Sequence, residues 1–149
     1  MTPHFTAREL TRSQYAERMG INNVPHSAQL AAMLKLAVNI LEPVRRHFGR
    51  PVYVSSGFRS RELNAAIGGA VGSQHCLGEA ADFEVAGVDN YEVIRWIAGH
   101  LKFDQAIAEY VKSSDPESGW IHCSYRGGDR NRHEVLSRDR TGYFEGLPR

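Results

Sequence analysis

Between residues 27 and 48, apolar side chains recur every three or four positions, which is the strongest pattern in the chain. The spacing predicts a helix that buries one apolar stripe in the core. Ser27 is the expected N-cap and Gly49 the expected stop. Pro43 lies inside the pattern and should kink or break the helix, because proline lacks the N–H of an inner turn. The apolar positions are Leu30, Met33, Leu34, Ala37, Ile40, Leu41, Val44 and Phe48.

Three shorter helices are predicted from residues that cap helix ends. A capping side chain accepts hydrogen bonds from the free N–H groups of the first turn, so it marks where a helix begins. The segments are roughly 7–19, opened by a capping box of Thr6 and Glu9 and closed by Gly20; RELNAAI after Ser60; and YEVIRWIAGH after Asp89 or Asn90.

Four segments are rich in β-branched or aromatic residues, or alternate apolar and polar positions, and therefore predict strands. They are PVYVSS at roughly 51–56, AADFEV, DQAIAEY and WIHCSY. Alternation places Asp82 on one face of its strand and Phe83 on the other. Since the helices come first and the strands later, with short loops between them, we predict an α+β fold whose small antiparallel sheet packs against helices.

A chain of 149 residues suits one domain with its own hydrophobic core. We expect a helical part over 1–50, a sheet part that carries the chemistry over 51–127, and an irregular basic tail over 128–149. With 42% apolar and 23% charged residues and a net charge of +1, the composition gives no argument for a nucleic-acid partner. The arginines of the tail are interrupted by acidic residues, so we interpret them as a solvated face; attraction to an anionic cell wall is the functional alternative.

No segment of the sequence has the pattern of a leader or a membrane span. MTPHFTAREL lacks the apolar core of a secretory signal, and no apolar run approaches the roughly 20 residues that cross a bilayer. We therefore expect a monomer that is made in the cytoplasm without a signal peptide and has no membrane span.

Residues with metal-binding chemistry stand in two segments: His75 and Asp82 in SQHCLGEAADF, and His122 in GWIHCSY. The glycine-rich stretch over 68–78 lets the chain turn, so that a loop histidine can approach a strand aspartate. Two imidazole nitrogens and one carboxylate oxygen leave a fourth zinc position open for water, which is the arrangement of catalytic rather than structural sites. A zinc ion in such a site can make a nucleophile from water near neutral pH.

Cys76 and Cys123 each follow one of these histidines, which allows a rival Cys₂His₂ structural site. The alternation of WIHCSY argues against it, because Cys123 should point away from His122. The cysteine spacing also differs from the usual pattern of zinc ligands. We therefore interpret both cysteines as small buried thiols, and the remaining five histidines as surface or helix-end residues.

The segment SQHCLGEAADF fits the pattern S-x-H-x-x-G-x-A-x-D, and GWIHCSY supplies W-x-H. With SSGFRS upstream, these segments resemble the M15-type zinc D-alanyl-D-alanine carboxypeptidases and murein endopeptidases. The resemblance extends over residues 4–127 and is greatest to the short phage and prophage members. It implies the fold shared by D-Ala-D-Ala peptidases and the hedgehog signalling domain, with zinc as cofactor and His75, Asp82 and His122 as its ligands.

The resemblance also implies contacts with a substrate. Arg59, in GFRS, would hold a substrate carboxylate or the developing oxyanion, which suits the planar fork of a guanidinium. Ser73 and Gln74, just before the first ligand, would contact the peptide.

The general base is where the sequence departs from the family pattern. Many members carry Glu or Asp three residues before the last histidine ligand, and here that position is Gly119. A base must take a proton from water and later deliver it to the leaving amine. Glu109 is the candidate, because its strand precedes that of His122 and the two can lie side by side; Glu117 is the reserve.

The expected function is hydrolysis of a peptide bond in peptidoglycan. The reaction could be that of a D-Ala-D-Ala carboxypeptidase or of an endopeptidase at L-Ala-D-Glu or a cross-link. The expected setting is phage or prophage lysis, as an endolysin that reaches the wall in the host periplasm after release. A non-catalytic zinc-stabilised binding module, favoured by Gly119, and a host peptidase for free dipeptides are the alternatives.

Overall fold

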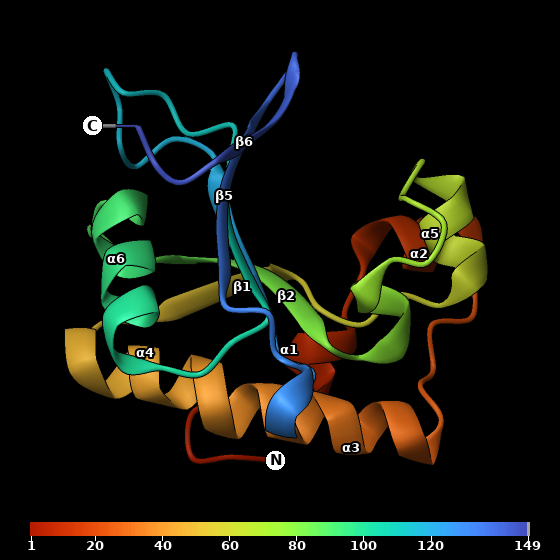
Figure 1. The fold of residues 1–149 in the computed structure, drawn as a ribbon. Coiled ribbons are helices and arrows are strands. Elements are labelled where there is room, and N and C mark those ends of the chain that lie inside the picture. Colours follow the sequence, from red (N-terminus) through yellow and green to blue (C-terminus); the bar gives the residue numbers. More distant parts are fainter. Residues whose placement is uncertain (149) are drawn as a thin grey trace.

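A computed structural model describes residues 1–148 of the chain (Figure 1). The helical elements are α1 (Ala7–Thr11), α2 (Gln14–Met19), α3 (Ser27–Leu36), the π-helical η1 (Ala37–Leu41), α4 (Glu42–Phe48), α5 (Arg61–Ala66), the 3₁₀ turn η2 (Gln74–Leu77), α6 (Asn90–His100) and the 3₁₀ turn η3 (Gly128–Arg130). The strands are β1 (Val52–Ser56), β2 (Ala80–Val85), β3 (Gln105–Glu109), β4 (Trp120–Ser124), β5 (Glu134–Asp139) and β6 (Gly142–Glu145).

The strands form one sheet in the order β1-β2-β4-β3-β5-β6. Neighbours are antiparallel except β3 and β5, which are parallel, so the α+β class is confirmed but the sheet is mixed. Both edges of β4 are already paired, with β2 and β3. When the chain reverses after β4 it therefore pairs with the next open edge, that of β3, and runs parallel to it.

The tail expected to be irregular contains two of these strands. β5 and β6 form an antiparallel hairpin, and Thr141 closes its turn by donating backbone and hydroxyl hydrogen bonds to the Asp139 carboxylate. Val135 and Leu147 pack against the core. The expectation of irregular structure was wrong here because EVLSRDR is mostly polar and charged, a composition that disfavours a strand, although the first five residues of β5 are half-buried in the sheet.

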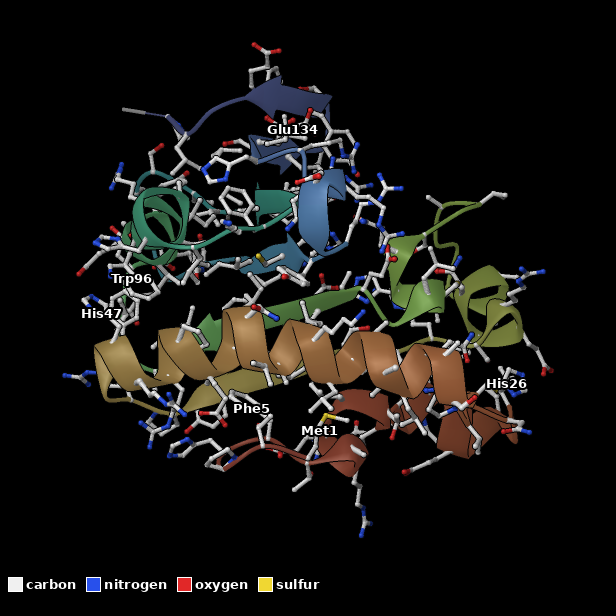
Figure 2. The ribbon with its side chains drawn as sticks, turned by 60° about the horizontal axis from the view of Figure 1, so that its bottom comes forward. Met1, Phe5, His26, His47, Trp96 and Glu134 are labelled. Carbon is white, nitrogen blue, oxygen red and sulfur yellow. The ribbon has the colours of Figure 1, made fainter. Side chains whose placement is uncertain are left out.

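The apolar stripe at residues 27–48 forms one long helix from α3 through η1 to α4 (Figure 1). Pro43 widens this helix instead of ending it. Since Pro43 has no N–H to donate to the carbonyl of residue 39, the ladder changes register just before it, and the Glu42 N–H donates to the Ala37 carbonyl five residues back. His47 near its end stacks on Trp96 of α6, with ring centroids 4.3 Å apart, and so ties the two helices together (Figure 2).

The helix expected over residues 7–19 is two helices. The capping box of Thr6 and Glu9 begins α1, and Gly20 ends α2 in the left-handed conformation, as predicted. Between them Arg12 is extended, and the Ser13 hydroxyl accepts from the Ala16 N–H to begin α2. A second capping residue inside the segment therefore breaks the helix.

Alternation along the strands gives the sheet one apolar face and one polar face. The apolar face packs on the long helix and α6, through Met33, Ile40 and Val44 of the former and Ile94 and Ile97 of the latter. The polar face carries the residues of the candidate site. None of the helices in the described chain is long and apolar enough to cross a membrane. The apolar-face residues of β2, β3 and β4 are Ala81, Phe83, Val85, Ala106, Ala108, Ile121 and Cys123.

Candidate metal centre

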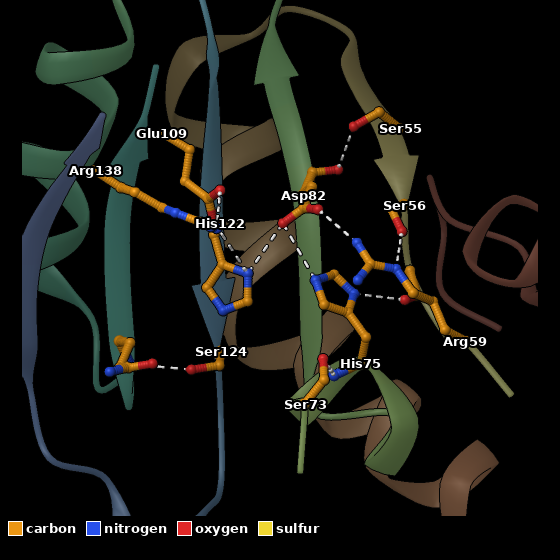
Figure 3. Close-up of polar contacts among 12 residues, drawn as sticks. Ser55, Ser56, Arg59, Ser73, His75, Asp82, Glu109, His122, Ser124 and Arg138 are labelled. Carbon is orange, nitrogen blue, oxygen red and sulfur yellow. Dashed lines mark hydrogen bonds and ion pairs between the residues drawn. The ribbon is translucent and has the colours of Figure 1, made fainter. Parts of the chain in front are cut away.

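Asp82 and His122 lie directly opposite each other in the antiparallel pair of β2 and β4. Both side chains project from the polar face of the sheet, and His122 Nδ1 is 3.0 Å from Asp82 Oδ1 (Figure 3). Strand register therefore brings together two residues that are 40 positions apart in the sequence.

His75 reaches the same carboxylate from the turn η2. Its Nδ1 lies 2.7 Å from the Gly57 carbonyl oxygen, which can only accept, so this nitrogen carries the proton. The opposite nitrogen, Nε2, is then free to act as a ligand and lies 3.3 Å from Asp82 Oδ1. Gly78 makes the turn from η2 into β2 at a φ of +75°, where an added Cβ would lie 2.5 Å from the Gln29 carbonyl oxygen. Only glycine fits there without displacing the long helix.

These three side chains fit a divalent cation. One ligand atom from each of His75, Asp82 and His122 lies within 4.8 Å of the others. Atoms bound tetrahedrally to zinc at about 2.0–2.2 Å are roughly 3.4 Å from one another, so the observed separations of 3.0 and 3.3 Å need little adjustment. The donor set, two imidazoles and one carboxylate, also leaves one tetrahedral position open. The structure thus brings the predicted ligands together, and their metal binding stays a prediction.

The charge of Asp82 suits a cation site. Burial alone would raise the pKa of this carboxyl, but its polar contacts with His122 and His75 outweigh burial and lower the pKa well below its usual range. The carboxylate is therefore ionised at neutral pH although almost no solvent reaches it.

Arg59 contacts the Asp82 oxygen that faces away from the two histidines. Its Nη2 is 3.2 Å from Asp82 Oδ2, its Nε donates to the Ser56 hydroxyl at 2.9 Å, and its Nη1 donates to the Asn64 side chain at 3.4 Å. All three guanidinium nitrogens thus have partners, and the side chain is only 15% exposed. In this arrangement Arg59 orients a metal ligand, while its contact with substrate stays a prediction.

Glu109 lies beside His122 on the same face of the sheet. Its Oε1 is 3.9 Å from His122 Nδ1, and its Oε2 is 3.4 Å from Arg138 Nη1 (Figure 3). Burial, and then the negative charge of Asp82, raise the pKa of Glu109. A carboxylate with a raised pKa, beside a candidate cation site, has the position of a proton acceptor and binds a proton more readily than a free carboxylate.

Gly119 cannot be replaced by the carboxylate that the family pattern places there. Its φ is +68°, and an added Cβ would lie 2.2 Å from the Glu109 carbonyl oxygen. The reserve candidate, Glu117, is exposed in the turn before β4, and no hydrogen bond or ion pair within residues 1–148 links it to the three ligands. Glu109 is thus the carboxylate nearest the ligand set.

A cleft of about 360 Å³ borders the metal centre on the side of His122, the one of the three candidate ligands that lines it. Ser73 and Gln74 line it together with Glu109 and His122, so both predicted peptide-contact residues border the site. The opposite wall comes from the tail and was not predicted. Sequence analysis missed it because the two apolar residues of EVLSRD are adjacent, so the segment lacks the alternation that predicts a strand. The tail residues are Arg132, Leu136 and Tyr143.

Neither cysteine belongs to this centre. The metal-binding group found among the described residues contains no sulfur ligand, and both cysteines are free thiols. Cys123 is fully buried on the apolar face of the sheet, where burial raises the pKa of its thiol. Cys76 is half-buried, less enclosed than expected.

A family model described as Peptidase M15 matches residues 3–124. The matched segment contains His75, Asp82, His122 and Glu109, and it ends before the β5–β6 hairpin. No curated protein matches the chain.

Proposed function

The chain belongs to the peptidase M15 family, and from that premise we propose that it is a zinc-dependent peptidase that hydrolyses a peptide bond in the stem peptides of peptidoglycan. The observation that carries this proposal is the convergence of His75, Asp82 and His122 on one point of the sheet, with Glu109 beside them. A structural zinc site would have a fourth protein ligand, whereas the group among the described residues has three, and one of them, His122, borders the cleft.

Zinc bound by the three ligands would lower the pKa of a water molecule and polarise the scissile carbonyl. The residues around it supply orientation. The Gly57 carbonyl fixes the ring of His75, and Arg59 fixes the carboxylate of Asp82. Such outer partners keep the ligand atoms aimed at one point in the absence of substrate.

Glu109 would move the proton. Burial raises its pKa and so makes the carboxylate a stronger base, and it would take a proton from the attacking water and deliver it to the leaving amine. Arg138, which lies 3.4 Å from Oε2, holds one oxygen and leaves Oε1 directed at His122.

The bond and the setting belong to the proposal as well. We propose either carboxypeptidase action on D-Ala-D-Ala or endopeptidase action at L-Ala-D-Glu or a cross-link, in phage or prophage lysis. In that setting the protein would act as an endolysin on the wall in the host periplasm.

Digestion of purified peptidoglycan tests the proposal. We expect new amino groups and muropeptide fragments whose masses identify the bond, a loss of both in a chelator, and recovery when zinc is added back. Cleavage at full rate in excess chelator would exclude the metal-dependent reaction. Soluble D-Ala-D-Ala serves as a second substrate, because cleavage of the dipeptide alone would point to a peptidase for free dipeptides.

A binding module that uses zinc only for stability is the alternative function. The pairing of Glu109 with Arg138 and the glycine at position 119 favour it, because both reduce the free carboxylate available for catalysis. A protein that binds zinc and sediments with peptidoglycan, but releases no amino groups from it, would support this alternative.

A further inference from the structure

Arg132, the arginine that lines the cleft, is held in place by several hydrogen bonds. It lies in the loop before β5, and the Asp104 carboxylate accepts hydrogen bonds from its backbone N–H at 2.9 Å, its Nε at 3.0 Å and its Nη2 at 2.7 Å. Asp104 itself is fully buried just before β3. The neighbouring residues His133 and Glu134 donate backbone hydrogen bonds to Phe103 and Asp104, so the loop is held on both its side chain and its main chain.

The same carboxylate connects Arg132 to the metal centre. Gln74 donates from Nε2 to Asp104 Oδ2 at 2.9 Å, and Gln74 is the residue before the ligand His75. One buried carboxylate therefore sets the position of a residue on each wall of the cleft. The turn η2, which carries His75, and the tail are therefore connected through the Asp104 carboxylate.

Only one edge of the Arg132 guanidinium is used in this network. Nε and Nη2 face Asp104, whereas Nη1 has no hydrogen-bond partner among residues 1–148. The side chain is 48% exposed and lines the cleft together with His122 and Glu109. The free edge, formed by Nη1 and the second Nη2 hydrogen, matches the two oxygens of a carboxylate.

The alternative anchor, Arg59, lies outside this cleft and is engaged elsewhere. Each of its nitrogens already donates to Asp82, Ser56 or Asn64, and it does not line the cleft that contains His122. Arg132 is also preorganised, because Asp104 holds its side chain before any ligand arrives, and an arginine fixed in this way loses little entropy on binding.

We infer that Arg132 binds a carboxylate of the substrate peptide and is a specificity-determining residue of the cleft. This inference rests on the proposed peptidase function. A stem peptide offers this chemistry from two sources, the C-terminal carboxylate and the carboxylate of an internal acidic residue. Arg132 recognises one of them and thereby sets which bond lies over the metal centre.

The test compares three synthetic stem peptides: one with both carboxylates free, one with the C-terminus amidated, and one with the internal acidic residue amidated. For the wild-type protein we expect one of the two amides to lower kcat/KM about 10- to 100-fold, the loss of one charge-assisted hydrogen-bonded contact. The amide that causes the loss identifies the source. Arg132→Gln should lower kcat/KM for the unmodified peptide by a similar factor, mainly through KM.

The decisive readout is the coupling between the protein change and the substrate change. In Arg132→Gln the sensitive amide should cost no further activity, because the contact is already gone. A structural role would instead lower the activity on acid and amide by the same factor and keep their ratio. Arg140→Gln, in the exposed β5–β6 turn, removes an equal charge from the same tail and should keep the wild-type ratio.

Two further arms keep the inference open to refutation. Arg132→Lys retains the charge and can still contact Asp104, so it covers the case in which Arg132→Gln does not fold; its preference for the acid should fall several-fold. Equal cleavage of all three peptides by the wild type would overturn the inference. If no peptide is cleaved, the proposed function fails, and calorimetric binding of the same peptides to the zinc-loaded protein still tests Arg132: equal affinity for acid and amides would overturn it.

Discussion

At the residue scale, the carboxylate of Asp82 contacts three other side chains of the metal centre. Its Oδ1 faces His75 and His122, and its Oδ2 faces Arg59. The orientation of this one side chain therefore decides whether the three ligand atoms point at a common position. Residues that hold Asp82 should matter for metal binding even if they never touch the metal.

Arg59→Gln tests this positioning role. We expect zinc affinity to fall about 10- to 100-fold, the usual loss when a partner of a metal ligand is removed. Competition with a chromophoric chelator measures the affinity without any turnover. If zinc affinity is unchanged and only KM for peptide rises, Arg59 contacts the substrate instead, as the family resemblance implies.

Glu109→Gln separates catalysis from metal binding. The amide keeps the size of the side chain but cannot accept the proton, so turnover should fall at least about 100-fold while zinc content stays at the wild-type level. Metal analysis and the release of amino groups from peptidoglycan measure the two effects. Activity retained in this variant would assign the base elsewhere, with Glu117 the next residue to test.

At the scale of elements, the return from β3 to β4 depends on a glycine. Gly119 has a left-handed backbone and its Cα lies against the carbonyl of Glu109. Gly119→Ala should therefore lower the free energy of unfolding by about 3 kcal/mol, from the unfavourable φ and the clash together. Gly20→Ala is the matched control, because its φ of +64° is similar but nothing lies within 4 Å of the added Cβ. Urea unfolding should show a cost of only about 1 kcal/mol for the control.

A Gly119→Ala variant as stable as Gly20→Ala would mean that the β3–β4 return can move away from the added methyl group. The absence of a carboxylate at this position would then need an explanation other than space.

Strand alternation is the part of the site that the sequence predicts best. The segments AADFEV and WIHCSY each have one apolar and one polar face, and the polar faces carry Asp82 and His122 in the structure as expected. The pairing of Arg59 with Asp82 could not be predicted. Arg59 lies in a loop, and the sequence does not indicate whether such a side chain faces solvent or a buried carboxylate. The break at Ser13 was likewise hidden, because one capping residue inside a helical pattern looks like any exposed serine.

At the scale of the whole molecule, Asp104 connects the tail to the rest of the protein. Burial would raise its pKa, but hydrogen bonds from Arg132 and Gln74 outweigh burial and lower it. Since the folded pKa lies below the unfolded value of about 3.9, ionised Asp104 stabilises the fold fully above that pH. The stabilisation is lost as the pH falls through the folded pKa.

Asp104→Asn should therefore be less stable than the wild type by about 2 kcal/mol at pH 7, and the difference should shrink below about pH 4. Urea unfolding at pH 7 and near pH 3 measures both values. Asp129→Asn, an exposed aspartate of η3, controls for the loss of one negative charge. A gap of constant size across this range would mean that the ionised form of Asp104 contributes nothing to the stability of the tail.

The packing of the tail was beyond sequence analysis for a physical reason. Asp104 follows Phe103 in a segment where an aspartate is ordinarily solvated, and only the tertiary fold reveals that Arg132 and Gln74 meet there. β5 is also stabilised mostly by pairing with β3, a contact between residues about 30 positions apart that local propensity does not encode. The α+β class and the three residues that converge in the candidate site could be predicted from the sequence; the second wall of the cleft could not.

The parallel pairing of β5 with β3 has an evolutionary consequence. The proposed zinc ligands and base lie in one stretch of chain, from His75 to His122, and the tail residues that line the cleft lie in another, from Arg132 to Tyr143. The two stretches are consecutive and do not interleave. A hairpin of different sequence in this place can thus change the wall of the cleft that meets the peptide while β2 and β4, which carry Asp82 and His122, keep their pairing.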